Sequence, residues 1–203
     1  LEKEGLLENT LIFLSSDNGP VLDDGYVDDA IEKLGKHSPT GGLRGGKYSL
    51  YEAGTRVPFI TYWKGNIEAG VSNNIISQVD WLSSLSTITD SIITNLDSEN
   101  HMDLLLGKVK EGRSDVVLEA TSRTAYRQGD WVLIPPYPGP KMFLTKGIET
   151  GNGEEFQLYN LEKDASQQNN LAETMPEKRD EMMRAFKAIV GNSYKKTSKL
   201  KFD

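Results

Sequence analysis

Two apolar runs joined by a long polar segment are the sequence feature that most constrains the fold. The runs are residues 10–14 and residues 56–63. The first is bounded by turn residues and follows what reads as the end of a helix over residues 1–9. This pattern is typical of a strand that is covered on both faces, as in a parallel sheet. A helix followed by such a strand predicts an α/β fold.

The stretch from residue 15 to residue 60 contains the predicted site. Its polar part is longer than the roughly 15 residues of an ordinary connection, and loops of that length are usually functional or disordered. In α/β sheets, ligands bind beyond the carboxyl ends of strands, which is where Asp17 and Asn18 lie. The two ends of the polar part are Ser15-Ser16-Asp17-Asn18-Gly19-Pro20 and Gly41-Gly42-Leu43-Arg44-Gly45-Gly46-Lys47.

Composition excludes several classes of protein. The chain has 203 residues, a net charge of -7 and no cysteine. The negative charge argues against a nucleic-acid partner, and no apolar run approaches the roughly 20 residues of a membrane span. Without cysteine there is no disulfide, thiolate nucleophile or cysteine zinc site. The two histidines are too few for a di-zinc phosphohydrolase, which typically uses several.

Asp17 and Asn18 are adjacent hard-oxygen donors after the first apolar run. A carboxylate and an amide oxygen suit calcium or magnesium, but calcium takes about six to eight oxygens, so the pair supplies only part of a site. The same residues, followed by Gly19 and Pro20, are also the ones that turns prefer. A plain turn therefore remains an alternative.

Lys47 and His37 are candidate contacts to an anion. Glycines let the backbone approach a ligand closely, and the lysine after them can meet a sulfate or phosphate oxygen as a point charge. The loop is not a Walker loop, because Tyr48 follows Lys47 where Ser or Thr is required. His37 could donate a hydrogen bond or carry a proton. A surface lysine and an exposed loop histidine are the alternatives.

Other charged residues of this region read as structural. We expect Glu52 and Arg56 to hold the loop by pairing with each other, and His101 to lie on the surface. The acidic residues after Pro20 do not match an EF-hand, because its glycine and closing glutamate are not in register. We expect a solvated acidic face from Asp23, Asp24, Asp28 and Asp29.

The character of the chain changes after residue 110. A helix that starts near Ser77, with an apolar face of Val79, Leu82, Leu85 and Ile88, precedes the change. Short strands with tight turns follow it. A last helix opens with Thr174 as the expected N-cap and lays its apolar face on these strands. The predicted strands are residues 116–120, 124–127, 131–134, 142–144 and 155–159, and the predicted face is Met182, Met183, Phe186, Ile189 and Val190.

In order and spacing these pieces resemble the carboxyl-terminal part of the type I sulfatases, the formylglycine-dependent arylsulfatase family. The specific part of the resemblance lies in residues 9–20, 37–47 and 51–60. It continues more loosely through Leu105-Leu106-Gly107, Tyr126-Arg127-Gln128-Gly129-Asp130-Trp131, Leu158-Tyr159-Asn160-Leu161-Glu162-Lys163-Asp164 and Asn169-Asn170-Leu171-Ala172.

The resemblance implies a fold, a reaction and roles for residues. Residues 1–110 would be the end of an alkaline-phosphatase-like α/β core, and residues 111–203 a small antiparallel sheet with a C-terminal helix. Asp17 and Asn18 would be calcium ligands, Lys47 would contact the sulfate, and His37 would contact sulfate or substrate. The reaction would be hydrolysis of aryl or carbohydrate sulfate monoesters by a hydrated formylglycine, with calcium and lysine balancing charge. The family is commonly periplasmic or extracellular.

One departure from the family pattern is severe. Formylglycine is made from Cys or Ser in a Cys/Ser-x-Pro/Ala-x-Arg signature, and the chain has no such pentapeptide. We therefore expect a fragment that is inactive alone, whose exposed strand edges and apolar face favour self-association. The alternatives are a phosphoester or phosphonate hydrolase of the same superfamily, and a non-catalytic homologue that binds sulfated glycans.

Overall fold

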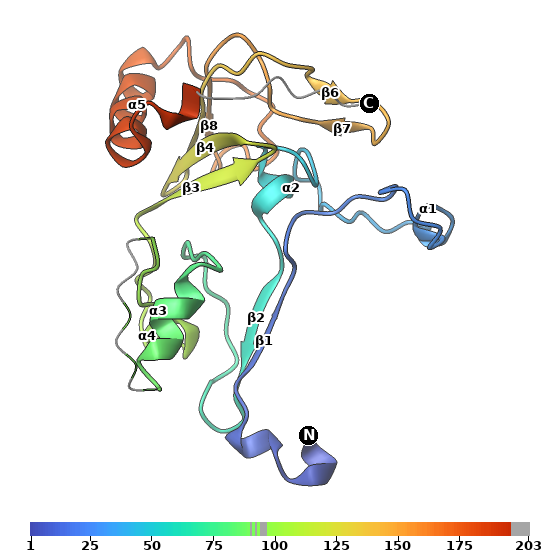
Figure 1. Cartoon of the computed structure of the whole chain (residues 1–203), viewed down its shortest axis with the longest axis vertical. Coiled ribbons are helices and arrows are strands. Elements are labelled where there is room, and N and C mark those ends of the chain that lie inside the picture. The colour runs from blue at the N-terminus through green and yellow to red at the C-terminus, as the bar shows by residue number, and fades with distance from the viewer. Residues whose placement is uncertain (90, 92, 94–96, 196–203) are drawn as a thin grey trace. The chain divides into compact units, whose positions relative to one another are not determined.

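The computed structural model describes residues 1–89, 91, 93 and 97–195, and it divides into two compact units (Figure 1). Unit 1 comprises Leu1–Ser15 and Pro58–Val116, and unit 2 comprises Ser16–Val57 and Val117–Asp203. The long segment between the two apolar runs, Ser16–Val57, is called the polar connection below. It belongs to the same unit as the carboxyl-terminal sheet. The predicted domains, residues 1–110 and 111–203, stay a prediction.

In unit 1 the two apolar runs form strands β1 (Ile12–Ser15) and β2 (Phe59–Tyr62), and these pair antiparallel. The predicted parallel arrangement is wrong for this pair, because an apolar run specifies burial but carries no information about strand direction. One face packs on aromatic rings, with the Phe13 and Trp81 centroids 5.6 Å apart. The opposite face leaves Leu14 56% and Ile60 57% exposed. The expected apolar face is therefore present, and the expected cover on both faces is not.

The helices of unit 1 are short. They are η1 (Glu2–Glu4), η2 (Leu7–Asn9), α3 (Asp80–Ser86) and α4 (Met102–Leu105). Helix α3 confirms the predicted helix, but its predicted apolar face is wrong, since Val79, Leu82 and Ile88 are exposed. The helix instead buries Asp80 and Ser84 completely.

Asp80 joins α3 to the chain that follows it. Its carboxylate accepts hydrogen bonds from Arg113 Nη2 at 2.6 Å and Nε at 2.8 Å, and from the backbone N–H of Glu99 at 2.9 Å. The backbone N–H of Ser77 also donates to it at 3.0 Å, which gives the helix start one half of a capping box. Burial opposes ionisation of this carboxyl, but these hydrogen bonds outweigh burial and lower the pKa of Asp80.

Unit 2 contains a sheet of four strands in the order β3-β4-β5-β8, as far as the described residues show. The strands are β3 (Asp115–Ala120), β4 (Arg123–Gln128), β5 (Trp131–Ile134) and β8 (Gln157–Asn160). Strands β4 and β5 form the predicted hairpin, and β5 pairs antiparallel with β8. A two-stranded sheet of β6 (Met142–Phe143) and β7 (Ile148–Glu149) confirms the short strand expected near residue 142.

Helix α5 (Pro176–Val190) covers one face of the four-stranded sheet (Figure 1). Met182, Met183 and Phe186 pack on Tyr126 and Leu133, as predicted. The expected Thr174 cap is wrong. The residue before the helix is Met175, while the Thr174 hydroxyl donates to the Leu171 carbonyl at 3.3 Å. Pro176 at the first position makes the start itself favourable, since proline lacks the N–H that would need a cap.

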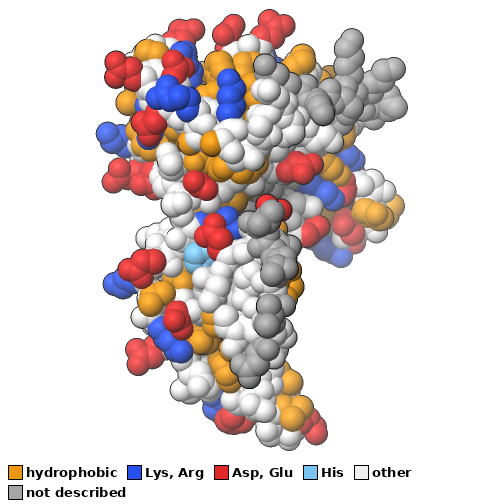
Figure 2. Space-filling view, turned by 60° about the vertical axis from the view of Figure 1, so that its left-hand side comes forward, with side chains coloured by type: hydrophobic (Ala, Val, Ile, Leu, Met, Phe, Trp, Pro, Cys, Tyr) orange, Lys and Arg blue, Asp and Glu red, His pale blue; other side chains and the backbone are white. Residues whose placement is uncertain are grey.

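The polar connection covers the opposite face of that sheet. Leu50 and Tyr51 share a buried cluster with Val132, Ile134 and other sheet residues. The connection also contains the helices α1 (Ala30–Lys33) and α2 (Glu52–Thr55), and η3 (Ser193–Lys195) follows α5. None of the helices in the described part of the chain has the length and hydropathy to cross a membrane. On the face drawn in Figure 2, acidic and basic side chains are interspersed with apolar ones.

Candidate functional site

The turn that carries Asp17 and Asn18 is seated on helix α2 through Gly19. Gly19 is buried, and its N–H donates to the Gly54 carbonyl at 2.8 Å. A Cβ at this position would lie 1.6 Å from the carbonyl oxygen of Ala53, so only glycine fits. Backbone contact with a segment 35 positions later therefore fixes this turn, which a plain surface turn would not need.

Asp17 and Asn18 present oxygen atoms at the edge of this turn. Asp17 is exposed and Asn18 is half-buried. The Asn18 amide nitrogen donates to the Gly19 carbonyl at 3.0 Å, which leaves the side-chain oxygen of Asn18 to accept. Two hard-oxygen donors fit a calcium ion as part of its coordination shell. The described residues contain no group of three or more His, Cys, Asp or Glu placed to hold a metal, so they do not complete such a site.

Lys47 lies beside the same turn. Its backbone N–H donates to the Pro20 carbonyl at 2.9 Å. Gly46 makes this approach feasible, because a Cβ there would be 2.7 Å from the Pro20 oxygen. The structure thus brings the two ends of the polar connection together. Lys47 is bonded to the backbone of Pro20, which follows the Asp17–Asn18 pair by two positions.

The Lys47 side chain has partners that sequence reasoning missed. Lys47 Nζ and Asp24 Oδ2 are 2.5 Å apart, and the Tyr48 hydroxyl donates to Asp24 Oδ1 at 2.6 Å. The hydrogen bond from Lys47, followed by that from Tyr48, lowers the pKa of Asp24, and the bond to Asp24 raises the pKa of Lys47. The expectation that Asp24 belongs to a solvated acidic face is therefore wrong. No local pattern marks a partner 23 positions away.

Tyr48 is held in an unusual backbone conformation. Its φ is 76°, in the left-handed region that non-glycine residues rarely adopt. Its ring packs edge-on against Phe143 with centroids 5.3 Å apart, and Lys47 Nζ lies 5.3 Å from the Tyr48 ring centre. Strain of this kind costs on the order of 1–3 kcal/mol and persists where surrounding contacts impose it. Here the contacts with Asp24 and Phe143 do so.

His37 stands apart from these residues. It is exposed, and its backbone N–H donates to the Leu34 carbonyl at 3.1 Å in the turn after α1. Among the described residues no hydrogen bond or ion pair joins its imidazole to Lys47, Asp17 or Asn18. The structure does not bring His37 to the other predicted site residues, and its role stays a prediction.

Comparison with known proteins identifies the family. Residues 1–91 match the family model described as Sulfatase. The chain is also 40% identical to an N-acetylgalactosamine-6-O-sulfatase of Bacteroides thetaiotaomicron over 181 residues, which is 87% of this chain and 35% of that protein. The chain belongs to the sulfatase family. It is 33% identical to human arylsulfatase A over 55% of its own length and 21% of that protein.

Solved sulfatases share its fold. A Bacteroides thetaiotaomicron sulfatase from work on glycosaminoglycan metabolism superposes with a TM-score of 0.87 at 37% identity, over 93% of this chain and 40% of that one. A Pseudoalteromonas sulfatase superposes with a TM-score of 0.68 at 26% identity, over 97% and 40% of the two chains. These likenesses confirm the predicted α/β sulfatase fold. The match to the Bacteroides N-acetylgalactosamine-6-O-sulfatase covers most of this chain, but the chain spans little more than a third of that protein's length.

Two ion-pair groups hold the connection of this sulfatase-family chain on its sheet. Glu52 is buried and pairs with Arg56 at 3.4 Å, as predicted, and with Arg127 of β4, also at 3.4 Å. Burial raises the pKa of Glu52 against the opposing effect of the two arginines. Arg44 donates to both carboxylate oxygens of Glu149, at 2.8 and 2.5 Å. These pairs fix the glycine-rich loop from which Lys47 extends.

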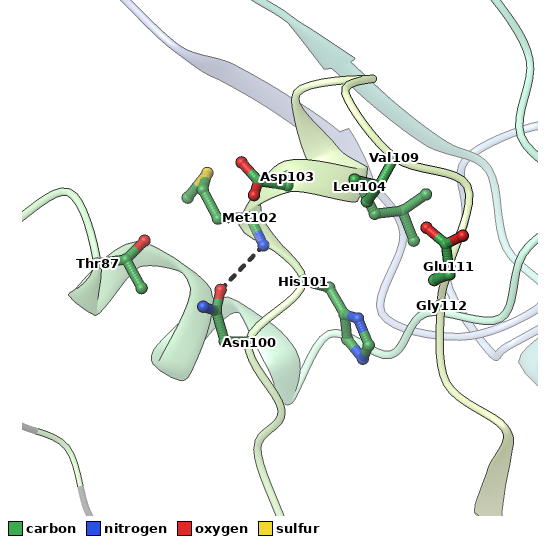
Figure 3. Close-up of a pocket in the computed structure, with 9 residues that line it drawn as sticks. All are labelled: Thr87, Asn100, His101, Met102, Asp103, Leu104, Val109, Glu111 and Gly112. Carbon is green, nitrogen blue, oxygen red and sulfur yellow. Dashed lines mark hydrogen bonds between the residues drawn. The ribbon is translucent and has the colours of Figure 1, made fainter.

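A pocket lies elsewhere, in unit 1 (Figure 3). Its volume is about 440 Å³, and it includes His101 and Met102 of the α4 start, together with Thr87, Asn100, Asp103, Leu104, Val109, Glu111 and Gly112. The His101 side chain is 11% exposed and pairs with Glu99 at 3.1 Å, so the expectation that it is a surface residue is wrong. None of the predicted sulfate or calcium residues lines this pocket.

Proposed function

We propose that the complete protein hydrolyses sulfate monoesters of carbohydrates, and that its substrate class is a 6-O-sulfated N-acetylhexosamine. The observation that carries this proposal is the placement of Lys47. Its backbone is bonded to Pro20 beside the Asp17–Asn18 turn, in a chain 40% identical to an N-acetylgalactosamine-6-O-sulfatase. Sulfate hydrolysis needs positive charge next to the sulfuryl oxygens, and the Lys47 ammonium group would supply it in this proposal.

In this proposal Lys47 binds the sulfate group of the substrate. An ammonium group has three N–H donors, and Asp24 takes one of them. The ammonium group can direct its other N–H donors at sulfuryl oxygens, where its charge stabilises the negative charge that develops as the ester bond breaks. His37 is proposed to contact the substrate or to pass a proton to the leaving group, since imidazole titrates near neutral pH.

Asp17 and Asn18 are proposed to hold part of a calcium site. Their exposed carboxylate and free amide oxygen suit this ion. When bound, calcium supplies positive charge that stabilises the sulfate oxygens. The nucleophile is proposed to be a formylglycine outside these 203 residues, because they contain neither cysteine nor a Ser-x-Pro/Ala-x-Arg sequence. A periplasmic or extracellular location is also proposed, as is common in the family.

The test is sulfate release by the full-length protein. N-acetylgalactosamine 6-sulfate, the 4-sulfate, an aryl sulfate and the matching phosphate esters are the substrates, and intact mass checks for formylglycine. We expect release from the 6-sulfate and a loss on the order of 10²-fold or more in Lys47→Ala and Asp17→Ala. Lys33→Ala is the matched control. Lys33 lies in the same connection, is 74% exposed and, among the described residues, forms an ion pair with the exposed Asp29.

The outcomes separate three functions. Cleavage of phosphate esters with sulfate esters left intact would identify a phosphoester hydrolase of the same superfamily. Binding of sulfated sugars without cleavage by a correctly matured protein would identify a non-catalytic homologue. The 203-residue chain alone is expected to give no turnover, and sulfate release by it above a Lys47→Ala control would contradict the proposed location of the nucleophile.

A further inference from the structure

We propose that Asp24 makes the Lys47 site selective for singly charged sulfate monoesters over doubly charged phosphate monoesters. This inference rests on the proposed function, in which Lys47 contacts the ester group. It assigns a specificity-determining role to a residue that touches the lysine and not the reacting bond.

The geometry makes Asp24 part of the anion site. Its carboxylate bridges Lys47 Nζ at 2.5 Å and the Tyr48 hydroxyl at 2.6 Å. The side chains of Lys47 and Asp24 are only 26% and 22% exposed, so water screens the pair incompletely. An ester that accepts hydrogen bonds from the other two N–H groups of Lys47 would lie within a few ångströms of this carboxylate.

Separate contacts hold Lys47 and Asp24 in place. The Lys47 backbone is tied to Pro20 at 2.9 Å, so the lysine cannot move away from the turn as a whole. Tyr48 is locked by its left-handed backbone and by edge contact with Phe143, and its hydroxyl fixes the second oxygen of Asp24. The hydrogen bonds from Lys47 and Tyr48 also lower the pKa of Asp24, which keeps the carboxylate charged.

Two lysines near this place are each paired with an aspartate. Lys47 and Asp24 form a neutral pair, and the nearby Lys146 pairs with Asp23 at 3.7 Å to form another. A sulfate monoester carries one negative charge, whereas a phosphate monoester carries nearly two above its second pKa of about 6. The extra negative charge of the phosphate ester is therefore repelled by the Asp24 carboxylate.

The size of the effect follows from Coulomb's law. One extra unit charge at about 5 Å from a carboxylate changes affinity by roughly 4-fold at the dielectric constant of water and by more than 100-fold at an effective value of about 20. Because the pair is partly exposed, we take about tenfold as the expected discrimination.

The experiment compares a sulfate ester with its phosphate analogue in full-length Asp24→Asn protein. At about pH 8 the phosphate ester is doubly charged. The KM for the sulfate ester and the inhibition constant Ki of the phosphate ester of the same alcohol are measured, and their ratio KM/Ki is compared with wild type. We expect the ratio to rise about tenfold, because removing the carboxylate helps the doubly charged ester more. Asp24→Glu, which restores the charge, is expected to return the ratio toward the wild-type value.

Asp28→Asn is the matched control. It removes the same charge from the same loop. In the described part of the chain the Asp28 side chain accepts from the Ala30 N–H at 3.0 Å, a bond that the amide oxygen preserves. The ratio is expected to stay unchanged in this variant. A long-range effect of net charge would change it in both variants and would overturn the local role of Asp24.

The failures of the two proposals are distinguishable. Absence of sulfate release by wild type would refute the proposed function. Normal wild-type release together with an unchanged KM/Ki ratio in Asp24→Asn would overturn the selectivity role alone. If the phosphate ester inhibited neither the wild type nor Asp24→Asn, the selectivity role of Asp24 would likewise be overturned. A folding defect lowers the active fraction but leaves the ratio as it is, so it cannot imitate the expected result.

Discussion

Replacing Gly19 by alanine tests whether the turn of Asp17 and Asn18 is seated on helix α2. The new Cβ would lie 1.6 Å from the Ala53 carbonyl oxygen, where real Cβ contacts essentially never fall below 3.0 Å. The obstructing atom belongs to the backbone, so no side-chain rotation can relieve the clash. The turn has to move away by more than an ångström, and the 2.8 Å hydrogen bond from Gly19 to Gly54 is then lost.

The cost can be worked from these two effects. Overpacking of a close contact costs about 1–3 kcal/mol, occasionally more. Leaving a buried backbone group unpaired costs a further ~1–3 kcal/mol. Because the two changes share one displacement, we expect a loss of about 3–4 kcal/mol in the free energy of unfolding. Urea titration of the 203-residue chain, followed by far-ultraviolet circular dichroism, measures it.

Gly153→Ala is the matched control in the same unit. Among the described atoms its Cβ would meet the Gln157 amide nitrogen at 3.8 Å, which is an ordinary contact. The change in stability is expected to stay within about 0.5 kcal/mol. If Gly19→Ala lost less than about 1 kcal/mol while this control was neutral, the close seating of the turn on Ala53 and Gly54 would be refuted.

Three further predictions concern unit 1. Asp80→Asn leaves the guanidinium of Arg113, whose side chain is 9% exposed, without its buried counter-charge, so urea titration should show a loss of about 3 kcal/mol. Because the folded-state pKa of Asp80 is lowered, its stabilisation is present above the unfolded value of about 3.9 and is lost as the pH falls through the folded value. Wild type should therefore lose more stability than Asp80→Asn below about pH 4, and equal losses would contradict the lowered pKa. Ile60→Lys should reduce self-association in sedimentation velocity by charging the exposed apolar face, whereas Val71→Lys, at a position already 95% exposed, should not.

Sequence patterns located most elements because those elements are locally specified. The turn Gln128-Gly129-Asp130 between alternating apolar residues gives the β4–β5 hairpin. Helical spacing of Met182, Met183 and Phe186 gives the buried face of α5. The apolar pattern gave the wrong buried face for α3. The residues buried there are Asp80 and Ser84, which accept hydrogen bonds from Glu99, His101 and Arg113. Apolar periodicity cannot reveal a face whose partners are hydrogen bonds.

The residues of the candidate site also fall into two groups, those that the sequence identifies and those that only the fold reveals. Asp17, Asn18, Lys47 and His37 are identifiable because their residue types and spacing resemble a family motif. Asp24 and Tyr48 are not, since nothing local distinguishes Asp24 from the other acidic residues of its loop. Its contact with Lys47 appears only in the fold, which places the two side chains 2.5 Å apart.

The sequence by itself determined the family, the α/β class, the strands of the carboxyl-terminal sheet and the residue types available for binding an anion. These features depend on contacts between near neighbours in the chain or on motifs that can be read directly. Only the tertiary structure decided the antiparallel pairing of β1 with β2, the seating of Gly19 on Ala53, and the partnership of Asp24 with Lys47. Each of these joins residues more than 20 positions apart. Such contacts depend on strand direction, backbone approach and burial, which composition and periodicity do not encode.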